Sequence, residues 1–213
     1  METGMNFLIV DDHELVRRGL RGLLLDEYPA ARIAEAGSAR EALEIADGVD
    51  YCLALVDINL PGRDGLELLR DLKRLYPSLP VLVVSAHTEE EFAIRALKLG
   101  AAGYVSKQSA SDVLVSAVKK VLGGGRHISP IVAERLARAV SEGWEGQPHE
   151  TLSHRELQVL KKIAEGRSIK EIAAELTLSE KTIATYRSRI SDKLQLSSNV
   201  ELTRYAMLHH LAG

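Results

Sequence analysis

The chain of 213 residues is 46% hydrophobic and 27% charged, with a formal net charge of −3. This composition is typical of a soluble globular protein with one or two domains. No apolar run approaches the ~20 residues that cross a bilayer, and the N-terminus lacks the basic and then apolar pattern of a signal peptide. A cytoplasmic protein is therefore expected, and Cys52, the single cysteine, excludes a disulfide within the chain.

Charge is distributed unevenly along the chain. Residues 1–124 carry 14 Lys and Arg against 19 Asp and Glu, residues 125–150 carry 3 against 4, and residues 151–213 carry 10 against 7. The net charges of these segments are therefore −5, −1 and +3. An acidic first part and a basic last part indicate two domains with different partners, and the basic part is a candidate for binding nucleic acid.

The first 124 residues alternate short apolar runs, typical of buried strands, with segments of helical periodicity. The expected strands are 7–10, 32–36, 53–56, 81–84 and 103–106. A helical pattern of apolar residues follows each of them. Strict alternation of strands and helices predicts a parallel sheet with helices on both faces.

Polar side chains stand where four of these strands end. Asp11 and Asp12 follow the first strand, Asp57 follows the third, Ser85 the fourth and Lys107 the fifth. Because the carboxyl ends of parallel strands meet at one edge of a sheet, these groups are expected to lie close together. Three carboxylates, a hydroxyl and an ammonium group would form a site for a hard cation and a phosphoryl group.

This pattern, with the segments 60–65 (LPGRDG) and 100–104 (GAAGY), resembles the receiver domain of two-component response regulators. The resemblance implies a doubly wound, flavodoxin-like fold with a five-stranded parallel sheet. It also implies that Asp57 accepts a phosphoryl group from the phosphohistidine of a sensor histidine kinase. Lys107 and Ser85 would each bind one phosphoryl oxygen.

The same resemblance implies a metal ion and a conformational switch. Mg²⁺ would neutralise the clustered carboxylates and offset the charge of the transferring phosphoryl group. Its expected ligands are Asp12, Asp57, the backbone carbonyl of Asn59 and, through water, Asp11. Tyr104 would turn inward when Ser85 engages the phosphoryl group.

Some observations keep other interpretations open. A single Asp after a strand is more often a turn former or helix cap than a catalytic group, which suits Asp12 or Asp64 taken alone. Many receivers have Pro after the strand-end Lys, whereas Gln108 follows Lys107 here, so the geometry of that peptide is open. A phosphohydrolase on a similar fold would also use a strand-end Asp, but it would usually need a second acid where this chain has Asn59.

Residues 125–150 are expected to connect two domains. Pro130 suits the first position of a helix, and the apolar residues from Ile131 to Val140 indicate one short helix. Residues 141–148 (SEGWEGQP) are rich in turn formers, which predicts a flexible tether. The expected domains are therefore 1–124, 125–150 and 151–213.

Signals for helix starts follow one another closely in the last domain. Ser153 with Glu156, and Ser168 with Glu171, are capping boxes, and Ser179 is a third candidate cap. A tight break over 176–179 predicts a helix-turn-helix, although any small helical bundle would have similar spacing. The expected helices cover 153–165, 168–176, 180–194 and 199–209.

The segments 152–160 (LSHRELQVL), 170–173 (KEIA) and 178–183 (LSEKTI) resemble the DNA-binding domain of NarL/FixJ-class response regulators, also called LuxR-type. In the 180–194 helix, Ile183, Ile190 and Leu194 are expected to face the core, so the opposite face would enter the major groove. Long basic side chains suit phosphates and short hydroxyl side chains suit base edges. The residues expected to contact DNA are Lys170, Lys181, Thr182, Thr185, Ser188 and Arg189. Many relatives carry Lys where this chain has Ala184, so their base preference is not carried over to this chain.

Together these patterns predict a transcriptional regulator controlled by phosphorylation, with at most slow self-dephosphorylation as an enzymatic activity. Its partners would be a sensor histidine kinase and double-stranded promoter DNA, without a membrane, and phosphorylation is expected to favour a homodimer. A response regulator that acts through protein partners instead of DNA is the alternative. The sequence leaves open which surface forms the dimer and whether the receiver masks the 180–194 helix at rest.

Overall fold

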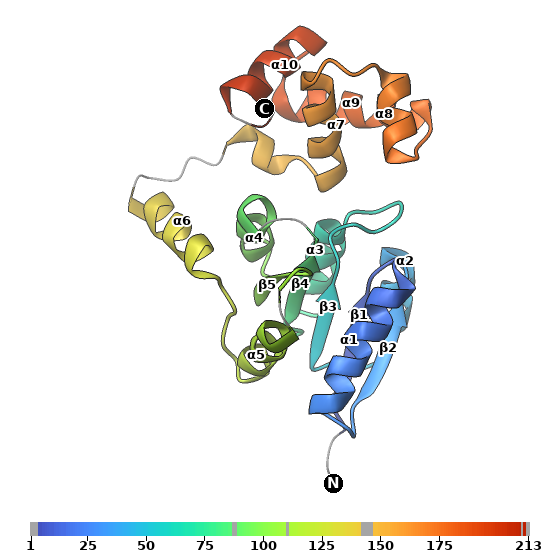
Figure 1. Cartoon of the computed structure of the whole chain (residues 1–213), viewed down its shortest axis with the longest axis vertical. Helices are drawn as coiled ribbons and strands as arrows, with labels where there is room; N and C mark the ends of the chain where they lie inside the picture. The colour runs from blue at the N-terminus through green and yellow to red at the C-terminus, as the bar shows by residue number, and fades with distance from the viewer. Residues whose placement is uncertain (1–3, 87–88, 110, 142–146, 210, 212–213) are drawn as a thin grey trace. The chain divides into compact units, whose positions relative to one another are not determined.

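The computed structural model describes residues 4–86, 89–109, 111–141, 147–209 and 211 (Figure 1). The chain divides into two compact units, Met1–Trp144 and Glu145–Gly213. Most of the expected tether, residues 142–146, lies outside the described residues. In the described part of the chain, no helix combines the length and the apolar character needed to cross a membrane.

The first unit contains a parallel sheet with the strand order β2-β1-β3-β4-β5 (Figure 1). Its strands are β1 (Asn6–Val10), β2 (Arg32–Ala36), β3 (Leu53–Val56), β4 (Val81–Ser85) and β5 (Gly103–Ser106). Each lies within one residue of the expected strand. The predicted doubly wound parallel sheet is therefore confirmed.

Helices cover both faces of this sheet. The helices of this unit are α1 (Glu14–Glu27), α2 (Ala39–Ala46), α3 (Gly65–Leu75), α4 (Glu89–Lys98), α5 (Ser111–Leu122) and α6 (Pro130–Ser141), and the first five flank the sheet. Helices α1 and α5 lie on one face, and α2, α3 and α4 lie on the other (Figure 1). Under α1 and α5, the strand residues Phe7, Leu55 and Val84 pack with Leu20 and Leu114. This buried layer holds the strand ends in place, and with them the polar residues that follow.

The segment after α5 pairs with the start of β5, the edge strand of the sheet. His127 lies beside β5 in a parallel bridge with Gly103, since the His127 N–H donates to the Ala102 carbonyl at 2.9 Å and the Tyr104 N–H donates to the His127 carbonyl at 3.3 Å. A Cβ at Gly103 would lie 2.6 Å from the His127 oxygen, so only glycine permits this approach. We call residues 126–128 the strap. Helix α6 follows and packs against α4, with Val132 buried.

The second unit is helical. A 3₁₀ helix (Pro148–Thr151) precedes α7 (His154–Ala164), α8 (Ile169–Leu176), α9 (Glu180–Leu194) and α10 (Asn199–Leu208). The predicted capping boxes at Ser153 and Ser168 are confirmed, and Ser179 caps α9 by accepting from the Thr182 N–H. Thr177 ends α8 in the left-handed conformation, with φ 54°, which turns the chain sharply toward α9. The predicted helix-turn-helix is therefore confirmed.

Candidate phosphoryl-transfer site and nucleic-acid interface

Asp57 lies directly after β3, and only 1% of its surface is exposed. Its backbone N–H donates to the Val10 carbonyl at 2.8 Å, which fixes it beside the end of β1. The loop that follows comes back to the end of β3 at Gly65, whose N–H donates to the Ile58 carbonyl at 2.9 Å. A Cβ at Gly65 would lie 1.9 Å from the Asp57 carbonyl oxygen. Both the preceding strand and the following loop therefore hold Asp57 in position.

Lys107 joins the carboxylates at the end of the sheet. Its Nζ lies 2.8 Å from Asp57 Oδ2 and 2.5 Å from Asp11 Oδ2, and its backbone N–H donates to the Ser85 carbonyl at 2.7 Å. Burial lowers the pKa of Lys107, but the hydrogen bonds and charges of Asp11 and Asp57 outweigh burial and leave its pKa above the usual value. No peptide bond between described residues is cis, so Lys107–Gln108 is trans. A charged ammonium group therefore faces two buried carboxylates.

The two oxygens of Asp57 differ in their surroundings. Oδ2 accepts from Lys107, whereas Oδ1 is buried and accepts no hydrogen bond from the described residues. Burial raises the pKa of the Asp57 carboxyl, the hydrogen bond and charge of Lys107 lower it in part, and the charge of Asp11 raises it further. The ionised carboxylate is therefore poorly solvated, with one oxygen open to a new partner.

Four side chains at this edge have the composition of a metal site. Potential ligand atoms of Asp11, Asp12, His13 and Asp57 lie within 4.8 Å of one another. His13 Nδ1 is 2.7 Å from Asp12 Oδ1 and 3.2 Å from Asp11 Oδ1. Clustered carboxylates repel one another without a cation, and their hard oxygens suit Mg²⁺. The donor set therefore fits a divalent cation, and it includes His13, which the sequence analysis did not select.

Three further residues of the expected site lie nearby in the fold. Ser85 is fully buried at the end of β4, and Tyr104 is buried in β5, so its ring lies inside the unit. Asn59 is partly buried in the loop after β3. The structure thus brings Lys107, after β5, into direct contact with both Asp11, after β1, and Asp57, after β3.

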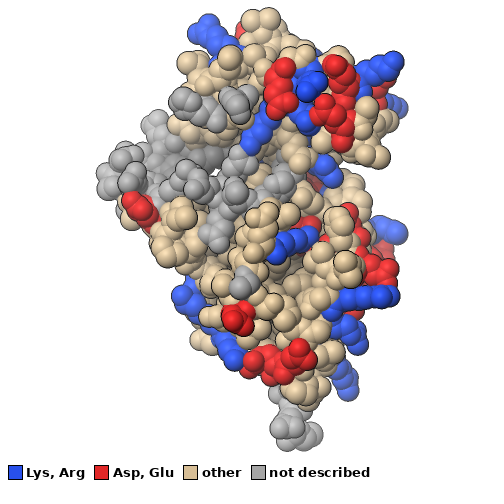
Figure 2. Space-filling model, viewed as in Figure 1, with Lys and Arg blue, Asp and Glu red and all other residues tan. Residues whose placement is uncertain are grey.

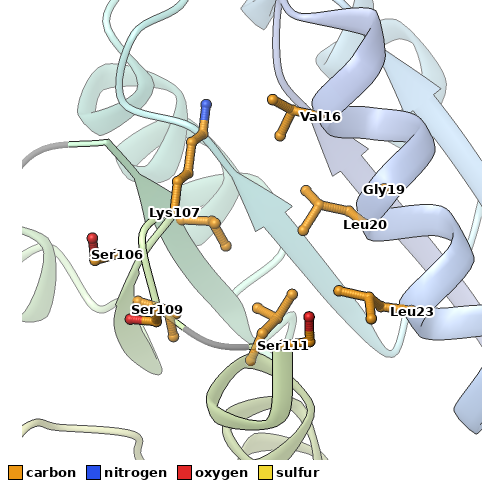
Figure 3. Close-up of a pocket in the computed structure, with 11 residues that line it drawn as sticks. Val16, Gly19, Leu20, Leu23, Ser106, Lys107, Ser109 and Ser111 are labelled. Atoms are coloured by element: carbon orange, nitrogen blue, oxygen red, sulfur yellow. The ribbon is translucent and has the colours of Figure 1, made fainter.

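A cavity of about 240 Å³ lies beside Lys107, between α1 and α5 (Figure 3). Its apolar wall includes Val16, Leu20 and Leu23 of α1, and serine side chains line another part. In Figure 3 the Lys107 nitrogen points away from Leu23. The alkyl part of Lys107 therefore covers apolar surface while its ammonium group is directed to the acidic cluster.

The expected core face of α9 is confirmed, because Ile183, Ile190 and Leu194 are buried. Most residues expected to contact DNA are exposed: Lys170, Lys181, Thr185, Ser188 and Arg189. Thr182 is half-buried, and its Oγ1 lies 2.8 Å from Ser179 Oγ. Five of the six expected contact residues are therefore available at the surface, whereas Thr182 also belongs to the helix cap.

Two contacts that the sequence analysis missed hold α9 against the rest of its unit. Lys193 Nζ lies 2.6 Å from Oε2 of the buried Glu156 and donates to the Thr151 carbonyl at 3.1 Å. Arg187 Nε donates to Asn199 Oδ1 at 2.6 Å, which ties α9 to α10. These contacts hold α9 against the 3₁₀ helix, α7 and α10.

Charge alone does not mark an interface on the face that Figure 2 shows. Figure 2 shows basic and acidic side chains intermixed on the visible face of both units. Ion pairs between described residues include Arg18 with Glu14, Arg40 with Glu44, and Lys162 with Glu175. The helix-turn-helix geometry, more than net charge, therefore identifies α9 as the candidate nucleic-acid interface.

Comparison with known proteins finds a family match for each of the two units. The model of the response regulator receiver domain matches residues 7–119, and that of bacterial regulatory proteins of the luxR family matches residues 150–206. The response regulator UvrY of Escherichia coli K12 is 36% identical over 210 residues, which cover 98% of this chain and 96% of UvrY. GacA of Pseudomonas aeruginosa is 37% identical over 203 residues, 95% of each chain.

Solved structures with a similar fold include a complex of the response regulator RcsB with DNA. It is 27% identical, covers 96% of this chain and 98% of RcsB, and has a TM-score of 0.58. RcsB from Salmonella enterica serovar Typhimurium, bound to the promoter rprA in the presence of phosphomimetic BeF₃⁻, is 28% identical with a TM-score of 0.57 and covers 95% and 98% of the two chains. The chain therefore belongs to the response regulators that combine a receiver domain with a regulatory domain of the luxR family.

Proposed function

We propose that phosphorylation of Asp57 controls the binding of this response regulator to promoter DNA. The observation that carries the proposal is the state of Asp57: it is buried, Lys107 binds one carboxylate oxygen, and the other oxygen has no hydrogen bond from the described residues. A poorly solvated carboxylate with one open oxygen suits nucleophilic attack.

In the proposed transfer, an Asp57 oxygen attacks the phosphorus of a phosphohistidine on a sensor histidine kinase. The phosphorus–nitrogen bond of the donor breaks, and the imidazole nitrogen keeps the electron pair. Lys107 and Ser85 each bind a phosphoryl oxygen, and Tyr104 is held inward when Ser85 does so. Mg²⁺, when bound, offsets the charge of the phosphoryl oxygens. Its proposed ligands are Asp12, Asp57, the backbone carbonyl of Asn59 and, through water, Asp11.

The proposed output is DNA binding by α9. Relatives whose structures contain DNA support this, among them two RcsB dimers bound to two parallel DNAs. In this chain Lys170, Lys181 and Arg189 would contact phosphates, Thr185 and Ser188 would reach base edges, and Thr182 is a further proposed DNA contact. We propose a homodimer after phosphorylation, in the cytoplasm, with domains at 1–124, 125–150 and 151–213. The chain would be a phosphoacceptor with at most slow self-dephosphorylation.

Phosphorylation is tested with a small phosphodonor such as acetyl phosphate and Mg²⁺, followed by mass spectrometry of the intact chain. Asp57→Asn is expected to abolish labelling. Asp64→Asn is the matched control, since Asp64 is a nearby buried carboxylate that caps α3 by accepting from the Leu66 N–H at 2.8 Å. Labelling that persists in Asp57→Asn would place the acceptor elsewhere.

DNA binding is tested with the whole phosphorylated chain and fragments selected from genomic DNA. Lys181→Ala is expected to weaken specific and non-specific binding alike and to reduce the salt dependence, because a phosphate contact releases counterions. Thr185→Ala or Ser188→Ala should instead change sequence preference. Lys120→Ala, which removes an exposed lysine of α5, is the control. If none of the α9 variants differed from the control, the proposal for α9 would be rejected.

A further inference from the structure

The chain that leaves β1 toward the acidic cluster is held at several points. The Asp11 N–H donates to the Ala36 carbonyl at 3.1 Å, and the His13 N–H donates to Asp11 Oδ1 at 2.9 Å. The Asp11 carbonyl accepts from Arg17 Nη1 at 2.7 Å. Both the N–H and the carbonyl of Asp11 therefore form hydrogen bonds, and the donor to the carbonyl is a side chain of α1.

Arg17 is itself held in place. Its Nε lies 3.3 Å from Glu35 Oε2 in β2, the strand beside β1, and only 18% of its side chain is exposed. Glu35 also pairs with Arg21, whose Nη1 lies 3.2 Å from Oε1. Among the described contacts, Arg21 bonds Glu35 but not Asp11. The two arginines thus share a carboxylate, and only Arg17 reaches the backbone of the site.

The backbone matters here because Asp12 is not fixed by burial. Its side chain is 35% exposed, and its ion pair is with His13, whose side chain is 63% exposed. The orientation of the Asp11–Asp12 peptide therefore sets where the Asp12 side chain starts, and the carbonyl of that peptide is the atom that Arg17 holds. A hydrogen bond from a guanidinium group is stronger than one between neutral groups.

From this geometry we propose that Arg17 is a positioning residue for the divalent cation: by holding the Asp11 carbonyl, it directs the Asp12 carboxylate toward Asp57. Glu35 keeps the Arg17 fork in place and offsets its positive charge, so Arg17 does not repel the cation. This inference rests on the proposed function, because it concerns the ion that phosphorylation of Asp57 requires. Groups that orient metal ligands from outside typically change metal affinity by about 10- to 100-fold when they are removed.

The test is a calorimetric Mg²⁺ titration of the whole chain without a phosphodonor. Arg17→Ala is expected to raise the Mg²⁺ dissociation constant about tenfold or more. Arg21→Ala is the matched control, because it removes an arginine paired with the same Glu35, and it should stay within about twofold of wild type. Arg17→Lys should recover part of the affinity, because an ammonium group can donate to the carbonyl but cannot bind Glu35 as a planar fork.

Two results would overturn the inference: an Arg17→Ala affinity within twofold of wild type, or an equal loss in Arg21→Ala. If Arg17→Ala does not fold, the Mg²⁺ affinity of Arg17→Lys is compared with that of Arg21→Lys. Equal Mg²⁺ affinities of these two variants would reject the inference. The proposed function is tested separately. Persistent labelling of Asp57→Asn would reject the phosphoacceptor, whereas unchanged Mg²⁺ affinity in Arg17→Ala, with wild type still labelled at Asp57, would reject only the role of Arg17.

Discussion

Exchange of Gly65 for Ala would show how tightly the loop after β3 is built around Asp57. The added Cβ would lie 1.9 Å from the Asp57 carbonyl oxygen and 2.8 Å from both the Asp57 carbonyl carbon and Ile58 Cα. Real Cβ contacts stay above 3.0 Å, so the backbone must move by roughly 1 Å. Overpacking typically costs about 1–3 kcal/mol, and backbone atoms cannot rotate away as a side chain can. We therefore expect a loss of about 3 kcal/mol and weaker labelling of Asp57.

The same substitution at Gly22 provides a control of opposite sign. Gly22 lies inside α1, with nothing within 4 Å of an added Cβ, so Gly22→Ala should stabilise the first unit by about 0.5–1 kcal/mol. Urea unfolding followed by circular dichroism measures both variants, with the transitions of the two units fitted separately. A Gly65→Ala chain that unfolds at the wild-type urea concentration and is labelled normally would refute the close approach of the loop to Asp57.

Three further outcomes are expected. Without metal, burial raises the pKa of Asp57, so the free energy of unfolding falls as pH rises through that pKa. In urea unfolding at neutral pH, Asp57→Asn should therefore be more stable than wild type. Mg²⁺ should reduce this difference in stability between the two chains. Backbone hydrogen bonds from Ser198 and Ser197 lower the pKa of Glu201 to about 2, so NMR titration should show the α10 cap intact above the usual value of 4.5 and lost as pH falls through about 2. Glu156→Gln should destabilise the second unit by about 1–3 kcal/mol in thermal unfolding, because it weakens the bond between a buried carboxylate and Lys193, whereas the exposed Glu165→Gln should have little effect.

The meeting of Asp11, Asp57 and Lys107 could be predicted from the sequence because a parallel sheet has only one carboxyl edge. The helix-turn-helix could be predicted because serine caps and apolar spacing mark each helix start. Arg17 could not be assigned a role, since its reach to the Asp11 carbonyl depends on the rotation of α1 and on a long flexible side chain. The pair of Glu156 with Lys193 joins residues far apart in the chain and leaves no local pattern. The DNA contacts of α9 stay a prediction, because exposure alone does not identify a base contact.

The strap determines where the first unit can be truncated without exposing the edge of its sheet. Without it, β5 would end the sheet as an open strand whose unpaired N–H and C=O groups invite another chain to add. A fragment ending at residue 124 keeps all five strands but lacks the His127 groups that bond Ala102 and Tyr104. A fragment ending at residue 141 keeps both bonds. Edge-to-edge aggregation is therefore expected of the shorter fragment, since the backbone that pairs with the start of β5 lies after α5, beyond the end of that fragment.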